Sequence, residues 1–120
     1  MGLMSTPAAV APAERFQTYA EFWPFYLQEH RLPATRRWHY VGTTGVFAIL
    51  ITAIATMHPL YLIAAPFSGY GCAWYSHFFV EKNRPATFKY PLWSLGSDFR
   101  MFFLALFGKL AAHLDAAGVK

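Results

Sequence analysis

The stretch Trp38–Val80, WHYVGTTGVFAILITAIATMHPLYLIAAPFSGYGCAWYSHFFV, contains no Asp, Glu, Lys or Arg over 43 residues. The hydrocarbon core of a bilayer is about 30 Å thick, and about 20 helical residues cross it. The stretch is therefore too long for one membrane span and about right for two. We predict crossings at Val41–Met57 and Leu60–Val80, joined by a tight turn at His58-Pro59. The expected fold is an all-α membrane protein built on a two-span transmembrane helical hairpin.

Two histidines occupy matching positions in this hairpin. His39 precedes His58 by 19 residues, and His77 follows His58 by 19 residues. Two antiparallel helices of equal length then place both imidazoles at one depth, near the open end of the hairpin. His58 lies at the turn, roughly 28 Å away at 1.5 Å per residue. His39 and His77 can therefore meet, and His58 is excluded from them.

The formal charge of +4 falls on the flanks of the hairpin and not on its turn. The flanking cations are Arg31, Arg36, Arg37, Lys82, Arg84 and Lys89. Positive charge favours the cytoplasmic side of a membrane. The pattern predicts an integral, multi-pass membrane protein with both termini cytoplasmic, in a bacterial inner membrane or, in a eukaryote, the endoplasmic reticulum. No basic stripe indicates nucleic-acid binding.

The composition along the chain predicts one domain with two short ends. Residues 1–13 are rich in Ala, Pro, Ser and Thr, and we expect them to be disordered. Residues 14–114 are expected to form a single membrane-embedded helical domain, and 115–120 a tail. Within the second crossing, the segment Pro66–Gly71 carries one proline and two glycines, which predict close helix packing or a local distortion.

Amphipathic or interfacial helices are expected on both sides of the hairpin. An aromatic helix is predicted over Glu14–His30, and Thr35 is predicted to cap the helix of the first crossing. A last helix is predicted to begin at Ser97, with Asp98 at its positive end. Its uncharged run is too short for a span, so an interfacial position is expected, with a kinked third crossing as the alternative.

Side chains that can carry chemistry gather at the predicted open end of the hairpin. They are His30, His39 and His77, with Glu81 and Asn83 close by. His77 and Glu81 are four residues apart, so they share one helix face. Three histidines and one carboxylate suit a divalent transition metal, and such sets with open positions suit ferrous iron and oxygen. Spacing alone leaves a second interpretation open, in which each histidine is an amphipathic interfacial residue.

Neighbouring polar residues also have two interpretations. Asn83 and Arg84 suit a carboxylate substrate or a solvated loop cap, and Glu29 suits a hydrogen-bond acceptor near the site or a helix-end charge. His113 is expected to be solvated. The sequence holds no Gly-x-Ser-x-Gly elbow, phosphate-binding loop or His-Glu-x-x-His motif. Its single cysteine, Cys72, excludes an internal disulfide.

Four segments form a pattern that is found together in one small membrane family. They are Phe25-Tyr26-Leu27-x-Glu29-His30; Arg36-x-x-His39-x-x-Gly42-Thr43; Gly69-Tyr70-Gly71-x-Ala73-Trp74-x-x-His77-Phe78-x-x-Glu81-Lys82-Asn83-x-Pro85-Ala86-Thr87-Phe88; and Pro91-x-x-Ser94-Leu95-x-x-Asp98. From roughly Phe22 to Met101 the chain resembles the family of the yeast 2-hydroxy fatty acid dioxygenase. One departure is Ser76, where many relatives have glycine.

The resemblance implies an iron(II)-dependent dioxygenase of fatty acid α-oxidation. Such an enzyme shortens a 2-hydroxy fatty acid by one carbon with O2 and releases the old carboxyl carbon. By position, the resemblance implies that His30, His39 and His77 are the Fe(2+) ligands. It places Glu81 and Asn83 beside the metal as candidate catalytic residues.

A metal at the open end of the hairpin would lie at headgroup level, where it can meet a fatty acid from the bilayer. Lys82, Arg84 or Lys89 would hold the substrate carboxylate by charge. One alternative is a metal-dependent membrane lipid hydrolase, with zinc activating water and Glu81 as base. Another is a non-enzymatic hairpin that packs with partner membrane proteins. The sequence leaves the oligomeric state open, a homo-oligomer included.

Overall fold

The computed structural model describes residues 15–119, and within that range the chain is helical and contains no strand. The α-helices are α1 (Tyr19–Gln28), α2 (Pro33–Thr56), α3 (Ala64–Tyr75), α4 (Pro91–Leu106) and α5 (Leu110–Ala116). Two 3-10 turns, η1 (Pro59–Ile63) and η3 (Ala86–Phe88), and one π-helical segment, η2 (Ser76–Glu81), complete the chain. The all-α prediction is confirmed. The predicted disordered segment 1–13 lies outside the described residues.

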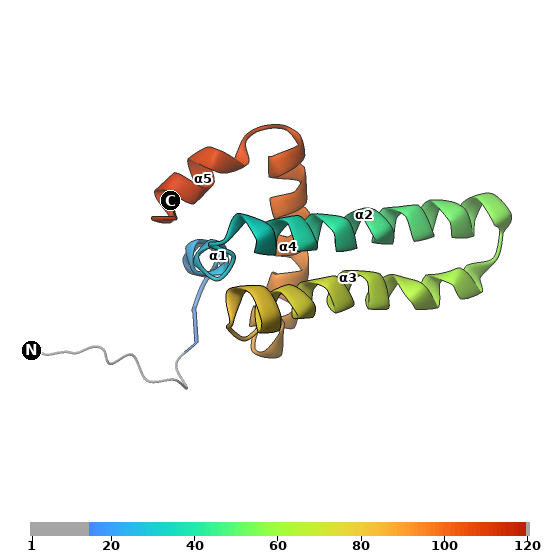
Figure 1. The fold of residues 1–120 in the computed structure, drawn as a ribbon, viewed down its shortest axis with the longest axis horizontal. Helices are drawn as coiled ribbons and strands as arrows, with labels where there is room; N and C mark the ends of the chain where they lie inside the picture. The colour runs from blue at the N-terminus through green and yellow to red at the C-terminus, as the bar shows by residue number, and fades with distance from the viewer. Residues whose placement is uncertain (1–14, 120) are drawn as a thin grey trace, which may run out of the picture.

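The helices α2 and α3 form the predicted hairpin, with its turn at His58-Pro59 (Figure 1). Met57 ends α2 in the left-handed conformation, with φ of 57°. The two helices pack closely, because a Cβ added at Gly42 would lie 2.8 Å from the Ser68 carbonyl oxygen. The Ser68 hydroxyl donates to the Gly42 carbonyl at 3.0 Å, which joins the two helices at this level.

Among the described residues 15–119, α2 is the one helix that is long and apolar enough to cross a membrane. Only 22% of its apolar window is buried within the protein. The second predicted crossing, Leu60–Val80, consists of three pieces with different helical geometry, η1, α3 and η2. A second continuous span is therefore not shown.

The distortion that the sequence suggested at Pro66–Gly71 is absent from α3, which runs through this segment without a break. Pro66 is the third residue of α3, and the first N–H groups of an α-helix have no partner inside the helix, so proline costs little there. The departures from α geometry come at the two ends of α3, where η1 precedes it and η2 follows it.

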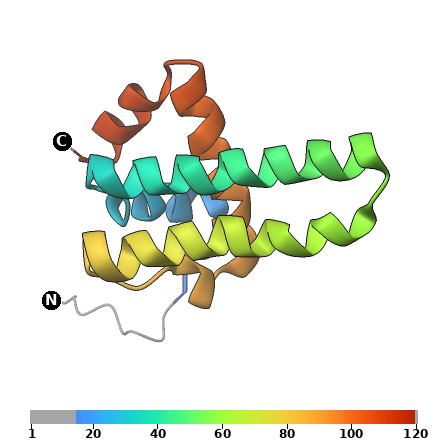
Figure 2. The ribbon, with the colours of Figure 1, turned by 45° about the vertical axis from the view of Figure 1, so that its right-hand side comes forward.

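The remaining helices close the open end of the hairpin. α4 runs across the hairpin near that end, and α1 and α5 lie on the same side of the molecule (Figures 1 and 2). α1 is shorter than predicted, because Thr18 caps it by accepting a hydrogen bond from the Glu21 N–H at 3.2 Å. Thr35, predicted as a cap, lies inside α2, which begins at Pro33 after Leu32.

The core lies between α1, α4 and α5 and is rich in aromatic rings. Its buried members are Phe22, Trp23, Tyr26, Leu27, Ala86, Tyr90, Met101, Leu110, Ala117 and Val119. The packed part of the chain thus continues beyond the predicted domain end at residue 114. His113, predicted to be solvated, is part of this packing, because the Trp23 indole N–H donates to its Nδ1 at 3.1 Å.

The start of the last long helix was predicted wrongly. α4 begins at Pro91, whose fixed φ and missing N–H suit the first helical position, and not at Ser97. Ser97 is fully buried inside α4, and its hydroxyl lies 2.7 Å from the Tyr19 hydroxyl. Asp98 is therefore not in the first turn of the helix, where its negative charge was predicted to lie. It lies in the middle of α4, where the helix passes under the open end of the hairpin.

Candidate metal centre

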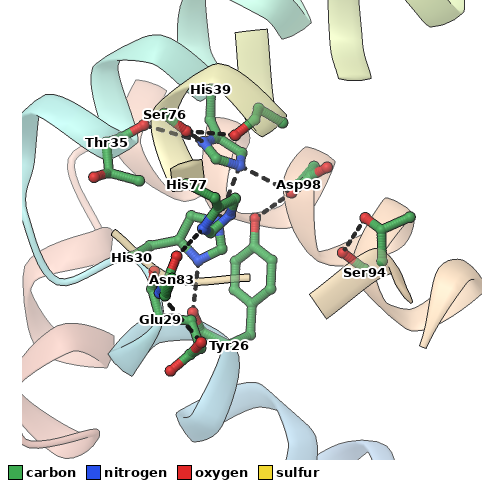
Figure 3. A network of polar contacts seen from close by, with 12 residues as sticks. Tyr26, Glu29, His30, Thr35, His39, Ser76, His77, Asn83, Ser94 and Asp98 are labelled. Atoms are coloured by element: carbon green, nitrogen blue, oxygen red, sulfur yellow. Dashed lines mark hydrogen bonds and ion pairs between the residues drawn. The ribbon is translucent and has the colours of Figure 1, made fainter. Parts of the chain in front are cut away.

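Three histidines from distant parts of the chain meet at the open end of the hairpin (Figure 3). His30 lies in the turn after α1, His39 in α2 and His77 in η2. The Nε2 atom of His30 is 3.0 Å from the Nε2 of His39 and 3.0 Å from the Nε2 of His77. All three side chains are buried, with residue exposures of 1%, 4% and 2%. His58 is exposed at the far turn, as predicted.

Each of the three rings is held through its other nitrogen by an oxygen acceptor. His30 Nδ1 lies 2.6 Å from the Tyr26 carbonyl oxygen, and His39 Nδ1 lies 3.0 Å from the Thr35 carbonyl oxygen. A carbonyl oxygen can only accept, so in both rings the proton is on Nδ1 and the Nε2 lone pair is free. Two such lone pairs 3.0 Å apart repel each other unless a cation or a proton lies between them.

His77 is fixed in the same tautomer by Asn83. The Asn83 amide oxygen lies 2.7 Å from His77 Nδ1. The orientation of this amide follows from its nitrogen, which donates to the Glu29 carbonyl and to the Glu29 carboxylate, both at 3.1 Å. Three Nε2 lone pairs therefore converge in a buried space. This is the arrangement of metal-ligating histidines, each oriented by an acceptor on its outer nitrogen.

The nitrogen separations fit a bound transition metal. Two ligands at right angles, each about 2.1 Å from one ion, are themselves about 3.0 Å apart. The His30–His39 and His30–His77 Nε2 distances have this value, and the ligand atoms of all three rings lie within 4.8 Å of one another. Burial lowers the pKa of His30 well below its usual value, and the His39 and His77 rings lower it further. The ring is neutral at neutral pH, which is the form that binds metals.

Local structure holds the His30 and His77 rings in place. His30 stacks on Tyr26, with ring centroids 4.1 Å apart, and its carbonyl accepts a hydrogen bond from Arg36 at 2.8 Å. His77 lies in the π-helical segment η2, and such segments are frequent at functional sites. The Asn83 N–H closes this segment by donating to the His77 carbonyl at 2.8 Å.

Ser76, which stands where many relatives have glycine, contributes to the site. Ser76 is fully buried, and its hydroxyl donates to the Ala73 carbonyl at 2.6 Å. Its oxygen lies 3.3 Å from His39 Nδ1 and is thus a second acceptor for that ring. The serine holds His39 in the same tautomer as the Thr35 carbonyl does.

Glu81 lies beside this centre but is engaged with the chain between α1 and α2. Its Oε1 accepts from the Leu32 N–H at 3.1 Å and from the Thr35 hydroxyl at 2.6 Å. Glu81 therefore ties η2 to the start of α2, where the Thr35 carbonyl holds His39. The cluster of ligand atoms found in the described chain consists of the three histidines.

Asp98 and Tyr26 belong to the site, and the sequence reasoning did not identify them. Asp98 Oδ1 lies 3.9 Å from His39 Nε2, and the Tyr26 hydroxyl donates to the same oxygen. Burial raises the pKa of Asp98 to about 7. One signal was available, because Asp98 is the single acidic residue of α4, a helix of mostly apolar residues.

The three predicted carboxylate-binding cations lie on the segment that joins η2 to α4. Lys82, Arg84 and Lys89 are exposed there, and Lys82 ends η2 with φ of 65°. The Lys89 carbonyl accepts a hydrogen bond from Arg15 at 2.5 Å, which ties this segment to the residues before α1. Binding of a substrate carboxylate by these side chains stays a prediction.

This buried trio of histidines belongs to a chain that matches a family model described as 2-hydroxy-palmitic acid dioxygenase Mpo1-like. The match covers residues 16–110, from the segment before α1 to the first residue of α5, and includes the three histidines and Asp98. The chain belongs to this family. No curated protein and no solved structure matches the chain. Membership of the Mpo1-like family confirms the resemblance seen in the sequence and relates the chain to 2-hydroxy fatty acid dioxygenases.

Proposed function

We propose that this protein is an iron(II)-dependent dioxygenase that shortens 2-hydroxy fatty acids by one carbon with O2. The observation that carries the proposal is the convergence of three buried, unprotonated Nε2 atoms, each ring being fixed by an acceptor at Nδ1. Family membership supports the substrate class. A structural role alone does not account for the site, because lone pairs 3.0 Å apart destabilise a metal-free fold.

In this proposal His30, His39 and His77 hold Fe(2+) and leave coordination positions for substrate and oxygen. The iron supplies the activation of O2 that an organic acid by itself does not provide. Asn83 acts as a positioning residue, because its amide fixes the tautomer of His77. Glu81 positions the beginning of α2 through Leu32 and Thr35.

Two further groups are proposed to orient the substrate. Asp98, beside His39, is placed to accept a hydrogen bond from the 2-hydroxyl group, with its own Oδ1 held by the Tyr26 hydroxyl. Lys82, Arg84 and Lys89 bring positive charge to the segment between η2 and α4 and attract the carboxylate.

We also propose that the hairpin is embedded in a membrane, with both termini on the cytoplasmic side. Large apolar side chains are exposed along its outer surface, including Ile51, Ile54, Phe67 and Phe79, each more than 60% exposed. Large exposed apolar side chains in such numbers are typical of a membrane or protein interface. A substrate that is itself a lipid then reaches the site from the bilayer.

The decisive experiment is metal analysis of protein purified in mild detergent, followed by oxygen uptake with 2-hydroxypalmitate. We expect about one iron per chain, oxygen consumption and formation of the acid that is one carbon shorter. His77→Ala should remove both the iron and the product, whereas His58→Ala at the far turn should retain both. Product without oxygen consumption would favour the hydrolase, and active His77→Ala protein would refute the ligand role.

A further inference from the structure

An apolar groove of about 440 Å³ runs along the hairpin on the side of α4. Its walls come from α2, α3 and α4 and include Val46, Leu50, Pro66, Tyr70, Leu95 and Phe99. We propose that this α4-side groove binds the acyl tail of the 2-hydroxy fatty acid and sets the accepted chain length. This inference rests on the proposed function and adds to it the place of the tail.

The groove residues on α2 lie on the same helix face as His39, and those on α3 lie on the same face as His77. On α2, Val46 and Leu50 follow His39 by 7 and 11 residues, so they lie on the same face, roughly 10 and 16 Å further along the helix. On α3, Tyr70 and Pro66 precede His77 by 7 and 11 residues. Each helix of the hairpin thus leads from a metal-ligating side chain into the groove wall.

The third wall is contributed by α4, which also brings Asp98 to the histidines. Leu95 and Phe99, the two α4 residues in the groove, stand on either side of Asp98 in the sequence. The Asp98 side chain is 15% exposed, whereas that of His39 is 3% exposed. Asp98 is thus more accessible than His39, and its neighbours on α4 belong to the groove wall.

The chemistry of this path matches a molecule with a polar head and an apolar tail. The lining of the groove in the described chain carries no charged side chain. The carboxylate of Asp98 and the three imidazoles lie outside the groove, toward the open end of the hairpin, and the groove walls extend from that side toward the turn. A 2-hydroxy acid whose head reaches the histidines has its hydrocarbon tail directed into this groove, where burial of each methylene is favourable.

A second groove in the hairpin serves as a control, because binding there would indicate a general lipid surface and not a substrate site. It has a volume of about 270 Å³ and is lined by Ala48, Ile49, Thr52, Tyr61 and Ala64. On α2 these residues belong to a different face from His39, Val46 and Leu50, so this groove does not lead to the histidines. Bilayer lipid would occupy both grooves alike, whereas the substrate tail should use only the α4-side groove.

Two adjacent alanines on α3 provide a matched pair of variants. Ala65 lines the α4-side groove and Ala64 lines the second groove. Ala65→Phe fills the part of the groove that is distant from the histidines, so it should exclude long tails and spare short ones. We expect the ratio of kcat/KM for 2-hydroxypalmitate to that for 2-hydroxyoctanoate to fall about tenfold or more. Ala64→Phe should leave this ratio unchanged. If both variants keep the wild-type ratio in an active enzyme, the groove proposal is wrong.

Photo-crosslinking of the wild-type protein tests the groove without relying on turnover or on the folding of a variant. The probe is a 2-hydroxy fatty acid with a diazirine near its methyl end, and mass spectrometry locates the labelled residues. Labelling should concentrate on Leu50, Leu62 and Pro66 and be displaced by excess 2-hydroxypalmitate. Equal labelling of Ala48 and Ile49 would indicate lipid binding without selection and would overturn the proposal. If wild-type protein consumes no 2-hydroxy acid, the dioxygenase assignment fails, and the labelling still decides whether the groove binds the tail.

Discussion

Asp98 Oδ1 lies 3.9 Å from His39 Nε2, which brings a carboxylate from α4 to the edge of a histidine cluster built by three other segments. The same oxygen accepts a hydrogen bond from the Tyr26 hydroxyl, and the Tyr26 ring in turn stacks on His30. The carboxylate and the imidazoles thus form one connected structure. A change at Asp98 should therefore affect the reaction at the metal.

Asp98→Asn keeps the shape of the side chain and removes its negative charge. We expect kcat to fall by about a hundredfold, in the range seen when a group that handles a proton is removed. Iron content should stay near that of the wild type, because His30, His39 and His77 are unchanged. Single-turnover kinetics and metal analysis of the same preparation separate these effects. Wild-type kcat in this variant would exclude a role for Asp98 at the substrate.

Asn83→Ala removes the acceptor that holds His77 Nδ1. The His77 ring can then rotate or change tautomer, so its Nε2 is no longer fixed toward His30. Loss of such an orienting group typically costs 10–100-fold in metal affinity, and we expect a decrease of about that size. Competition with a metal chelator measures it. Arg84→Ala, which changes an exposed side chain on the same segment, should keep wild-type metal affinity, and an equal loss in both variants would contradict this assignment.

The stability of the metal-free protein should depend on pH through His30. Burial lowers the pKa of this ring in the folded state, while in the unfolded chain it is about 6.5. The unfolded state therefore binds more protons in acid, and the free energy of unfolding should decrease as the pH falls from about 6.5 toward the lower folded-state pKa. Above pH 6.5 this contribution should be constant. Thermal unfolding across this range measures it, and His30→Gln should weaken the dependence.

Gly42→Ala tests the close contact between α2 and α3. The new Cβ would lie 2.8 Å from the Ser68 carbonyl oxygen and 3.0 Å from the Cys72 Cβ, so one helix must shift. We expect a loss of about 1–3 kcal/mol in the free energy of unfolding. Gly71→Ala is the matched control on α3, because nothing lies within 4 Å of its added Cβ. That change should be neutral or stabilising by up to about 1 kcal/mol. Equal destabilisation by both variants in equilibrium unfolding would show that close approach of the helices is unimportant.

Several features of this protein follow from local properties of the chain. The uncharged stretch from Trp38 to Val80, with the turn signal His58-Pro59 near its middle, predicts a helical hairpin. The equal separation of His39 and His77 from His58 then places the two rings at one level, because helical rise is constant. These predictions depend on periodicity and length, which a sequence records directly.

Other features depend on where distant elements meet, and the sequence alone predicted them wrongly or did not predict them. Ser97 and Asp98 look like a helix start, yet Pro91 begins the helix earlier, and the packing of α4 buries Ser97 and partly buries Asp98. Asp98 reaches His39 only because α4 crosses under the open end of the hairpin. The tautomers of the three histidines likewise depend on acceptors from Tyr26, Thr35 and Asn83, whose positions follow from tertiary packing and from the π-helical turn. The sequence by itself thus determined the hairpin and the level of its histidines, since these follow from local helix geometry. Only the tertiary structure decided the protonation and surroundings of those rings, because hydrogen-bond partners are set by how separate helices pack.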